Sequence, residues 1–289
     1  MKHMLSFGHG FSARALTPLL LAQGFSVTGT TRSQDKLAGL DATGVTAKIW
    51  PGTDLRKELK SATHLLLSAA PNADGDPVLN AMRDDIAAHA PNLEWVGYLS
   101  TTGVYGDADG GWVDEESPLN PSTKRGQMRV DAEAEWQSIA NLPLHIFRLA
   151  GIYGPGRGPF AKVRAGTARR IIKKGQVFSR IHVEDIAQIL AASIAQPNAG
   201  AIYNMCDDDP APPQDVIAYA AELLGMPLPE EVDFETADMT PMARSFYAES
   251  KRVRNDRIKN ELGVALHYPN YRAGLTSLLA LENALGEHG

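Results

Sequence analysis

Short apolar runs alternate with longer amphipathic stretches in the first half of the chain, which predicts strand–helix–strand units that feed a parallel sheet. The run over residues 63–68 is almost wholly apolar, as in a strand covered by helices on both faces. The strands expected on this basis span residues 4–7, 26–30, 45–49, 63–68, 94–100 and 144–149. The helices expected between them span residues 13–23, 33–40, 78–89 and 126–139.

Beyond residue 150 the alternation loosens, and glycine and proline gather over residues 151–159 and again over 210–213. Later segments still carry regular patterns. They predict helices over 185–195 and 214–224, a strand over 201–206, and a loop or edge strand over 232–240.

The fold class predicted from this organisation is α/β, a Rossmann doubly wound parallel sheet with a smaller C-terminal substrate lobe. We assign residues 1–152, together with about 181–205, to an NAD(P)-binding Rossmann domain. Residues 153–180 and 206–289 are assigned to the smaller substrate-binding lobe. Ligands of open parallel sheets bind outside the carboxyl ends of the strands, so we expect the site between the two lobes.

The first predicted strand runs directly into Gly8-His9-Gly10-Phe11-Ser12-Ala13, which follows the pattern Gly-x-Gly-x-x-Ala. Gly8 permits the tight turn into a helix, and Gly10 lets a pyrophosphate approach the backbone without a clashing Cβ. The helix that follows offers free N–H groups and the positive end of its dipole to phosphates. Against the alternative of a plain glycine-rich turn, the pattern predicts dinucleotide binding by Gly8, His9, Gly10, Phe11 and Ser12, with the backbone of His9 mattering more than its ring.

The second predicted strand ends in Thr30-Thr31-Arg32-Ser33 and carries no acid at its tip, where an acid would favour NAD by binding the ribose 2′-hydroxyl. A guanidinium at this place can bind a 2′-phosphate, and the hydroxyls of Thr31 and Ser33 can add to it. A solvated arginine is the alternative, but a positive charge at a helix start is mildly unfavourable. We therefore expect NADP(H) to be preferred over NAD(H), held by Thr31, Arg32 and Ser33. The competing acid, Asp35, is expected in the first helical turn.

The composition excludes several classes of partner and site. The chain has 289 residues and a net charge of −6, so no basic field favours nucleic acid or an anionic membrane. Its single cysteine, Cys206, excludes an internal disulfide or a cysteine-rich metal site and fits a core thiol. No apolar run approaches the length of a membrane span, and the first strand begins too early for a signal peptide. We expect a cytoplasmic protein that binds a small-molecule substrate and no metal.

Four further segments, taken with the glycine turn, resemble the extended and atypical short-chain dehydrogenase/reductases, in particular the NAD-dependent epimerase/dehydratase group. These segments are Ser68-Ala69-Ala70-Pro71, Leu99 to Asp107, Phe147 to Arg157 and Arg180-Ile181-His182-Val183-Glu184-Asp185-Ile186-Ala187. They follow the family's order and, with the turn, cover the chain from residue 5 to about 190. The resemblance implies a nicotinamide cofactor and a homodimer that pairs through the helices flanking the fifth strand.

The resemblance also implies roles for the residues of these turns. Ala69, Ala70 and Pro71 correspond to the turn beside the cofactor ribose, where small residues let the backbone come close. Ser100 joins them as a candidate for cofactor binding. Thr101 corresponds to the hydroxyl residue that hydrogen-bonds the reacting carbonyl or alcohol, which makes it the first catalytic candidate.

The chain departs from the resemblance at the family's Tyr-x-x-x-Lys pair. In the family the tyrosine is the general acid/base, and the lysine lowers its pKa and holds the ribose. Aligning Gly126 and Glu133 with the family's helix puts Arg125 at the tyrosine position and Arg129 at the lysine position. Arg129 can still hold the ribose or a phosphate, whereas the guanidinium of Arg125 is no general acid.

Two other side chains are catalytic candidates for the missing proton transfer. Tyr105 is the nearest phenol along the chain, although a tyrosine in this turn is usually packed. His182 can titrate near neutrality, although its apolar neighbours also fit a structural histidine. We expect an NAD(P)-dependent oxidoreductase or epimerase-like protein that acts on a sugar-nucleotide-like or small carbonyl or alcohol substrate. The alternative is a catalytically inactive NADP(H)-binding sensor or regulatory module, which the replacement of the pair by Arg125 and Arg129 favours.

Overall fold

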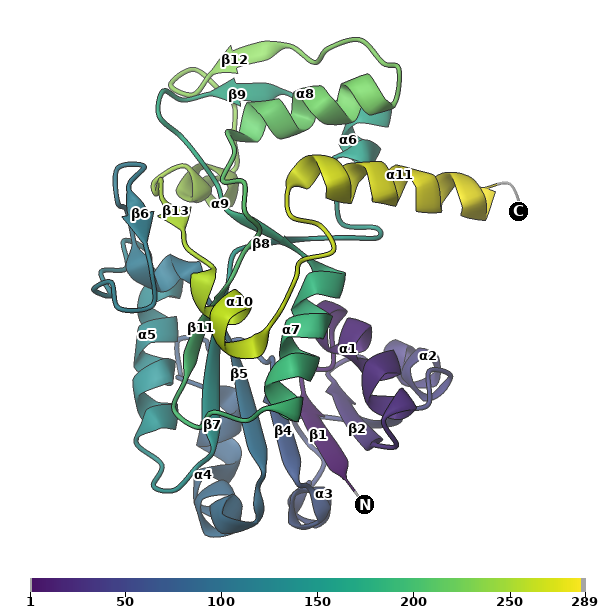
Figure 1. The fold of residues 1–289 in the computed structure, drawn as a ribbon, viewed down its shortest axis with the longest axis vertical. Helices are drawn as coiled ribbons and strands as arrows, with labels where there is room; N and C mark the ends of the chain where they lie inside the picture. Colours follow the sequence, from purple (N-terminus) through teal and green to yellow (C-terminus); the bar gives the residue numbers. More distant parts are fainter. Residues whose placement is uncertain (1, 287–289) are drawn as a thin grey trace.

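The computed structural model describes residues 2–286 and is built around a seven-stranded parallel sheet (Figure 1). The strand order is β11-β7-β5-β4-β1-β2-β3. The strands are β1 (His3–Phe7), β2 (Ser26–Thr31), β3 (Thr46–Ile49), β4 (His64–Leu67), β5 (Trp95–Thr101), β7 (Leu144–Leu149) and β11 (Ile202–Met205). The chain winds outward in one direction from β1 to β3 and in the other from β4 to β11, which confirms the predicted doubly wound Rossmann fold.

Helices cover both faces of the sheet because successive residues of each strand point to opposite sides. On one face, Met4 and Leu66 pack in one apolar cluster with α1 (Phe11–Ala22) and α7 (Val183–Ala195). On the other face, Leu5 and Leu65 pack in a second cluster with α3 (Arg56–Ser61), α4 (Pro77–His89) and α5 (Lys124–Gln137). The central strands β1, β4, β5 and β7 are therefore buried on both sides, as their apolar runs predict.

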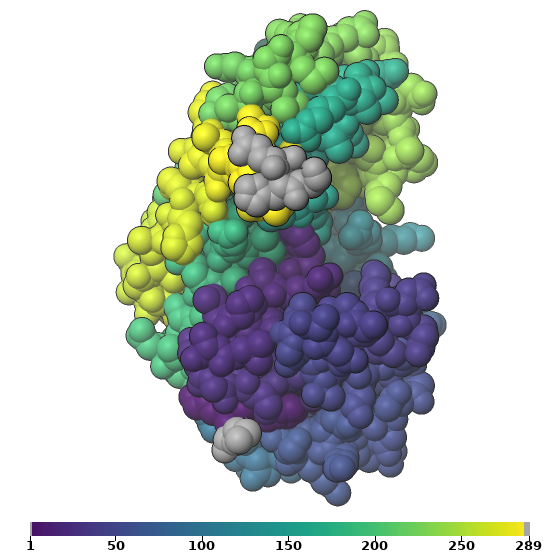
Figure 2. Space-filling view, turned by 90° about the vertical axis from the view of Figure 1, so that its right-hand side faces the viewer, coloured from purple at the N-terminus to yellow at the C-terminus, as the bar shows by residue number. Residues whose placement is uncertain are grey.

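The smaller lobe lies beyond the carboxyl ends of the strands and has its own apolar cluster (Figure 2). Its helices are α6 (Phe160–Arg164), α8 (Pro213–Leu223), α9 (Pro241–Phe246) and α11 (Tyr271–Gly286). Three two-stranded parallel ladders join this part of the chain together: β8 (Gly151–Tyr153) with β10 (Arg180–His182), β9 (Arg170–Ile172) with β12 (Glu231–Asp233), and β6 (Trp112–Val113) with β13 (Arg252–Val253). In Figure 2 the surface is recessed between the purple body and the teal and green lobe.

Some elements differ from the predicted ones. The helix expected over 33–40 is divided into the 3-10 turn η1 (Gln34–Lys36), which holds Asp35, and a short α2 (Leu37–Asp41). The expected edge strand over 232–240 is limited to β12. The helix α10 (Asp256–Leu262), whose residues fall in the range assigned to the small lobe, packs its buried face on α7 and on β11 of the sheet. Apolar residues late in the chain therefore contribute to the core beside the sheet.

Within residues 2–286 no helix is long and apolar enough to cross a membrane. The same residues contain no group of three or more His, Cys, Asp or Glu side chains arranged to hold a metal ion.

Candidate functional site

The turn between β1 and α1 has the shape that a dinucleotide phosphate requires. Gly8 has a φ of +75°, and a Cβ built on it would lie 2.8 Å from the backbone nitrogen of Ala69, so only glycine fits. Around Gly10, by contrast, such a Cβ would meet no described atom beyond the adjoining chain within 4 Å except the Gly8 carbonyl oxygen at 3.7 Å. Gly10 is the N-cap of α1 and contributes no side-chain cap, so the first N–H groups of this 12-residue helix stay available.

The side chain of His9 lies beneath this turn rather than over it. Its ring is buried against Gly29 of β2, and its Nε2 lies 3.0 Å from the hydroxyl oxygen of Thr17. Burial lowers the pKa of His9 to about 4, so the ring is neutral at physiological pH. The backbone N–H of His9 donates to the carbonyl of Thr30 at 2.8 Å, which ties the turn to β2.

The two residues after Gly10 are placed differently. Ser12 is buried in the first turn of α1, whereas Phe11 is half-buried with the guanidinium of Arg157 5.6 Å from its ring centroid. A Cβ on Gly154 would lie 3.1 Å from the ring of Phe11, so this ring reaches toward the β8 turn. Phe11 therefore lies between the phosphate turn and the smaller lobe.

The carboxyl end of β2 presents a free cation. Arg32 is exposed, and it forms no ion pair or hydrogen bond with any residue of the described chain through its side chain. The hydroxyl of Thr31 accepts from the N–H of Ser33 at 3.2 Å, which fixes the backbone beside it. The exposed guanidinium of Arg32 can therefore take a negatively charged partner.

Small residues after β4 close the turn from the other side. The backbone of Ala69 touches Gly8, and Ala70 and Pro71 follow it along the same edge with exposed or half-buried side chains. A larger residue at Gly8 would push this segment away. The sequence-predicted residues at β1, β2 and β4 are thus brought to one edge of the sheet.

Thr101 ends β5 at the same carboxyl edge, paired in register with Leu149 of β7. Its hydroxyl oxygen accepts the N–H of Gly103 at 3.1 Å and caps the 3-10 turn η3 (Thr102–Tyr105). Because the oxygen already accepts from the backbone, its own proton remains free to be donated. Thr101 can therefore donate a hydrogen bond to the carbonyl or alcohol oxygen of a substrate at this edge.

Tyr105 is held inside the protein by two polar partners. Its hydroxyl donates to Asn204 Oδ1 at 2.7 Å and accepts from Arg148 Nη1 at 3.0 Å. Burial raises the pKa of Tyr105 to about 12. A phenol that is buried and already bonded on both sides is poorly suited to exchange protons with a substrate.

His182 is also built into the packing. Its Nδ1 accepts the N–H of Glu184 at 3.3 Å and so caps α7, while the rings of Tyr153 and Tyr268 lie against it. Burial lowers the pKa of His182 to about 4. The geometry matches the structural histidine that its apolar neighbours suggested.

Beneath the edge lies a buried polar network that the sequence did not reveal. Glu133 of α5 and Arg148 of β7 form an ion pair with Oε2 and Nη2 2.8 Å apart, and both side chains are 3% exposed. The hydroxyl of Ser100 donates to Glu133, so this side chain faces α5 rather than the open edge. The only sequence signal was the presence of both residues in the compared segments, because their contact depends on packing a helix over the sheet.

The two arginines that the sequence analysis aligns with the family's Tyr-x-x-x-Lys pair lie in different surroundings. Arg129 is half-buried, and its Nη1 donates to the carbonyl of Leu99 at 2.8 Å and to the hydroxyl of Tyr98 at 3.0 Å. These bonds hold its guanidinium beside the end of β5, where it can reach a ribose or phosphate. Arg125 is exposed in the first turn of α5, which begins at the Thr123 cap.

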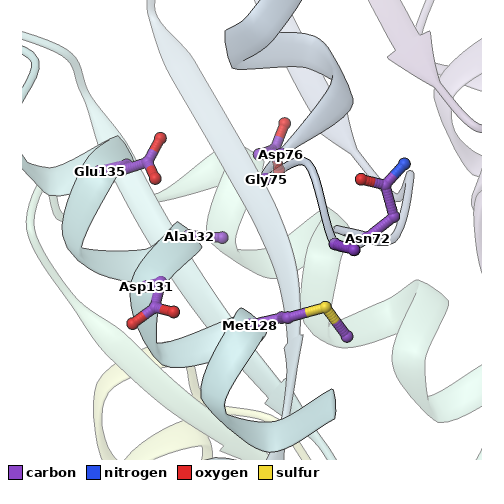
Figure 3. A pocket seen from close by; sticks show the side chains of 8 residues that line it. Asn72, Gly75, Asp76, Met128, Asp131, Ala132 and Glu135 are labelled. Atoms are coloured by element: carbon purple, nitrogen blue, oxygen red, sulfur yellow. The ribbon is translucent and has the colours of Figure 1, made fainter. Parts of the chain in front are cut away.

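A separate hollow lies between α5 and the loop before α4 (Figure 3). Asp76 at its rim caps α4 by accepting from Val78 and Leu79, and also accepts from the indole of Trp136 at 3.2 Å. The labelled side chains of Asp131 and Glu135 come from α5 and line the hollow. This hollow is shaped by helix packing and does not join the edge that carries Thr101.

Comparisons with known proteins give relatives of this chain, although no protein-family model matches it. The chain is 29% identical over 283 residues to protein YeeZ of Escherichia coli, covering 93% of this chain and 97% of YeeZ. It is also 26% identical over 177 residues to a 3-diazoavenalumate denitrifying reductase of Streptomyces, covering 57% of this chain and 55% of the reductase.

Solved structures extend the comparison. A dTDP-glucose 4,6-dehydratase from Bacillus anthracis in complex with NAD has a TM-score of 0.79 at 16% identity, with 99% of this chain and 98% of that chain covered. A human epimerase family protein with NADPH has a TM-score of 0.70 at 19% identity, with 96% and 99% covered. These structural neighbours are epimerase/dehydratase-type proteins with bound nicotinamide cofactors, and the likeness is one of fold.

One solved structure is much more similar. A conserved protein of unknown function from Silicibacter pomeroyi has a TM-score of 0.94 and 63% sequence identity, covering 97% of this chain and 99% of that chain. The chain therefore belongs to the same protein family as this Silicibacter pomeroyi protein.

Proposed function

We propose that the protein is an NADP(H)-dependent oxidoreductase or epimerase-like enzyme that acts on a sugar-nucleotide-like or other small carbonyl or alcohol substrate. The observation that carries the proposal is the turn at Gly8 and Gly10, which admits no side chain at the first glycine and leaves open space over the second. A turn of this shape at the start of α1 fits a pyrophosphate.

The unpaired guanidinium of Arg32 supports NADP(H) over NAD(H). It stands at the end of β2, where it can form a charge-assisted fork with a 2′-phosphate, and Thr31 and Ser33 lie beside it. The backbone of Gly10, Phe11 and Ser12 would hold the pyrophosphate. Nicotinamide cofactors bound by proteins of similar fold are consistent with this assignment.

When bound, the cofactor supplies or accepts a hydride at the reacting carbon. Thr101 then orients the substrate by hydrogen-bonding its carbonyl or alcohol oxygen, since the threonine proton is not used elsewhere. Arg129 binds the cofactor ribose through its other guanidinium nitrogens, because only Nη1 is used in the bonds to Leu99 and Tyr98. Because Tyr105 is bonded on both sides and His182 is buried with its Nδ1 capping α7, water at Thr101 is the proton source that the geometry favours.

Calorimetric titration of the full chain with NADPH, NADP+, NADH and NAD+ tests the cofactor. We expect the phosphorylated pair to bind at least tenfold tighter, Arg32→Ala to lose that preference, and Gly10→Val to lose all binding. Arg169→Gln, which removes an exposed charge in the smaller lobe, is the matched control and is expected to change nothing. If no dinucleotide binds the wild-type protein, the proposal is wrong.

The sensor remains the second candidate because Arg125 occupies the position of the family's tyrosine and is exposed. NADPH oxidation in the presence of a panel of carbonyl compounds and sugar nucleotides separates the two functions. Turnover that Thr101→Val lowers supports the enzyme. Tight NADPH binding without turnover of any panel member supports the sensor.

A further inference from the structure

Arg180 lies on the lobe side of the candidate site. It pairs in register with Gly151, two residues beyond Leu149, which itself pairs with Thr101. A Cβ built on Gly151 would lie 3.8 Å from Cγ of Arg180, and Gly151 is exposed. The stem of Arg180 therefore lies against open backbone at a position two residues along the chain from Leu149, the residue that pairs with Thr101.

The hydrogen bonds of Arg180 leave one side of its guanidinium unused. Nη1 donates to the carbonyls of Phe178 at 2.8 Å and Ala211 at 3.1 Å, which uses both of its hydrogens. Nε and Nη2 form no hydrogen bond within residues 2–286. Neither nitrogen is among the fully buried polar atoms that lack a partner, so both keep some contact with solvent. The Nε–Nη2 edge carries two parallel N–H groups, the arrangement that binds an oxyanion with two hydrogen bonds.

Arg180 also has no counter-charge in contact. No carboxylate oxygen of the described residues lies within 4.0 Å of its nitrogens, whereas the buried Arg148 has Glu133 at 2.8 Å. Asp207 lies beside it through the backbone, since the N–H of Asp207 donates to the carbonyl of Arg180 at 2.6 Å. Its own Oδ2 is buried without a hydrogen-bond partner, and burial raises the pKa of Asp207 well above its ordinary value, although the charge of Arg180 opposes that rise.

A largely desolvated guanidinium without an ion pair is unfavourable, and burial lowers the pKa of Arg180 accordingly. An anionic ligand on the Nε–Nη2 edge would supply the missing charge. The aromatic ring of Phe178, 5.9 Å from the guanidinium carbon, shields the other side of the group. The arrangement is that of a receptor for one small oxyanion rather than of a structural salt bridge.

We infer that Arg180 binds a carboxylate or phosphate group of the substrate while the reacting carbon lies at Thr101. The inference rests on the proposed function and narrows its substrate to a small carbonyl or alcohol compound that carries an acid group a few bonds from the reacting carbon. Arg180 is then the residue that selects charged substrates over neutral ones of the same size.

Calorimetric titration of the full chain with 4-oxopentanoate, inorganic phosphate and the neutral ketone pentan-2-one tests this inference. We expect saturable binding of 4-oxopentanoate or phosphate and at least tenfold weaker binding in Arg180→Gln, with partial recovery in Arg180→Lys. Arg169→Gln, an exposed arginine of the same lobe, is expected to bind as the wild type does. Binding of 4-oxopentanoate without phosphate identifies a carboxylate site, and the reverse identifies a phosphate site.

Equal affinity of the wild type and Arg180→Gln for the anions would overturn the inference, as would the absence of saturable anion binding. Each titration is done with and without NADPH. Failure of NADPH to bind then counts against the proposed function, while the anion result without cofactor still decides the role of Arg180.

A second measurement uses the wild-type protein and does not depend on the folding of a variant. Phenylglyoxal modifies accessible guanidinium groups, and mass spectrometry of the digested protein gives the rate at each arginine. Saturating anion is expected to slow the modification of Arg180 at least threefold and to leave that of Arg169 unchanged. An Arg180 that does not react at all, or reacts equally fast with the anion present, would also overturn the inference.

Discussion

Replacing Glu133 by glutamine removes one charge of an ion pair that is sealed inside the protein. The side chains of Glu133 and Arg148 are each 3% exposed, and their nearest atoms are 2.8 Å apart. Glutamine has the same size and can still accept from Ser100, but it leaves the guanidinium without its counter-charge. Breaking a buried pair from one side costs about 3–5 kcal/mol, because the remaining charge stays desolvated.

This loss is large enough to measure in two ways. An unfolding entropy of about 2.1 cal/mol/K per residue corresponds to roughly 0.6 kcal/mol/K for 289 residues. Glu133→Gln is therefore expected to lower the Tm by roughly 5–8 °C. Urea denaturation followed by circular dichroism gives the free energy of unfolding, and scanning calorimetry gives the Tm.

Two variants control for the substitution itself. Glu135→Gln changes an exposed residue of the same helix and is expected to alter the free energy of unfolding by less than about 0.5 kcal/mol. The double variant Glu133→Gln, Arg148→Met removes both charges and is expected to recover part of the loss. A cost below about 1 kcal/mol for Glu133→Gln would refute the reasoning, as would a double variant less stable than the single one.

Three further predictions follow from the geometry of the candidate site. Gly8→Ala is expected to lower the free energy of unfolding by about 1–3 kcal/mol in urea, because a φ of +75° and the nitrogen of Ala69 both oppose a side chain. Burial lowers the pKa of His182 to about 4, so the unfolded chain takes up the proton first and stability falls as the pH drops from 6.5 toward 4. Urea titrations at several pH values give the number of protons taken up on unfolding, and His182→Gln is expected to lower that number by up to about one in this pH range. In an NADPH-linked assay, Tyr105→Phe is expected to keep kcat within about twofold, whereas Thr101→Val lowers it about tenfold or more.

Each of these predictions has its own contradicting result. A Gly8→Ala protein as stable as the wild type would mean that the turn relaxes around a side chain. An unchanged pH profile in His182→Gln would mean that the ring is protonated equally in both states. Loss of turnover in Tyr105→Phe, with stability and NADPH binding retained, would return this phenol to the catalytic candidates.

The sequence predicted the sheet well because its central strands are short apolar runs and β2 is rich in β-branched residues. The strand expected over 144–149 matches β7 at both ends, and the others differ by one or two residues. The smaller lobe was harder to predict because β8, β9, β10 and β12 are three residues long and acquire their identity only by pairing with distant segments. Helix α11 carries an ordinary amphipathic pattern but follows a run of loops, and it was not predicted.

In the candidate site, too, residues placed by their own turn could be predicted, whereas residues placed by contacts with distant segments could not. Gly8 and Thr101 could be identified because their roles depend on the turn that each one starts. The orientation of Ser100 could not, since it depends on Glu133 of a helix 33 residues later. Arg180 stood in a compared segment, but its missing counter-charge is a property of the space around it and not of its neighbours along the chain.

The return of α10 to the sheet has a consequence for how the protein is made. Ile258 and Leu262 share an apolar cluster with Tyr203 and Met205 of β11, although more than 50 residues of the smaller lobe separate them. During translation the growing chain therefore exposes the outer strand of its sheet until residue 262 has emerged from the ribosome. Prematurely terminated products would present this apolar surface to chaperones and proteases, even though every strand of the sheet is present.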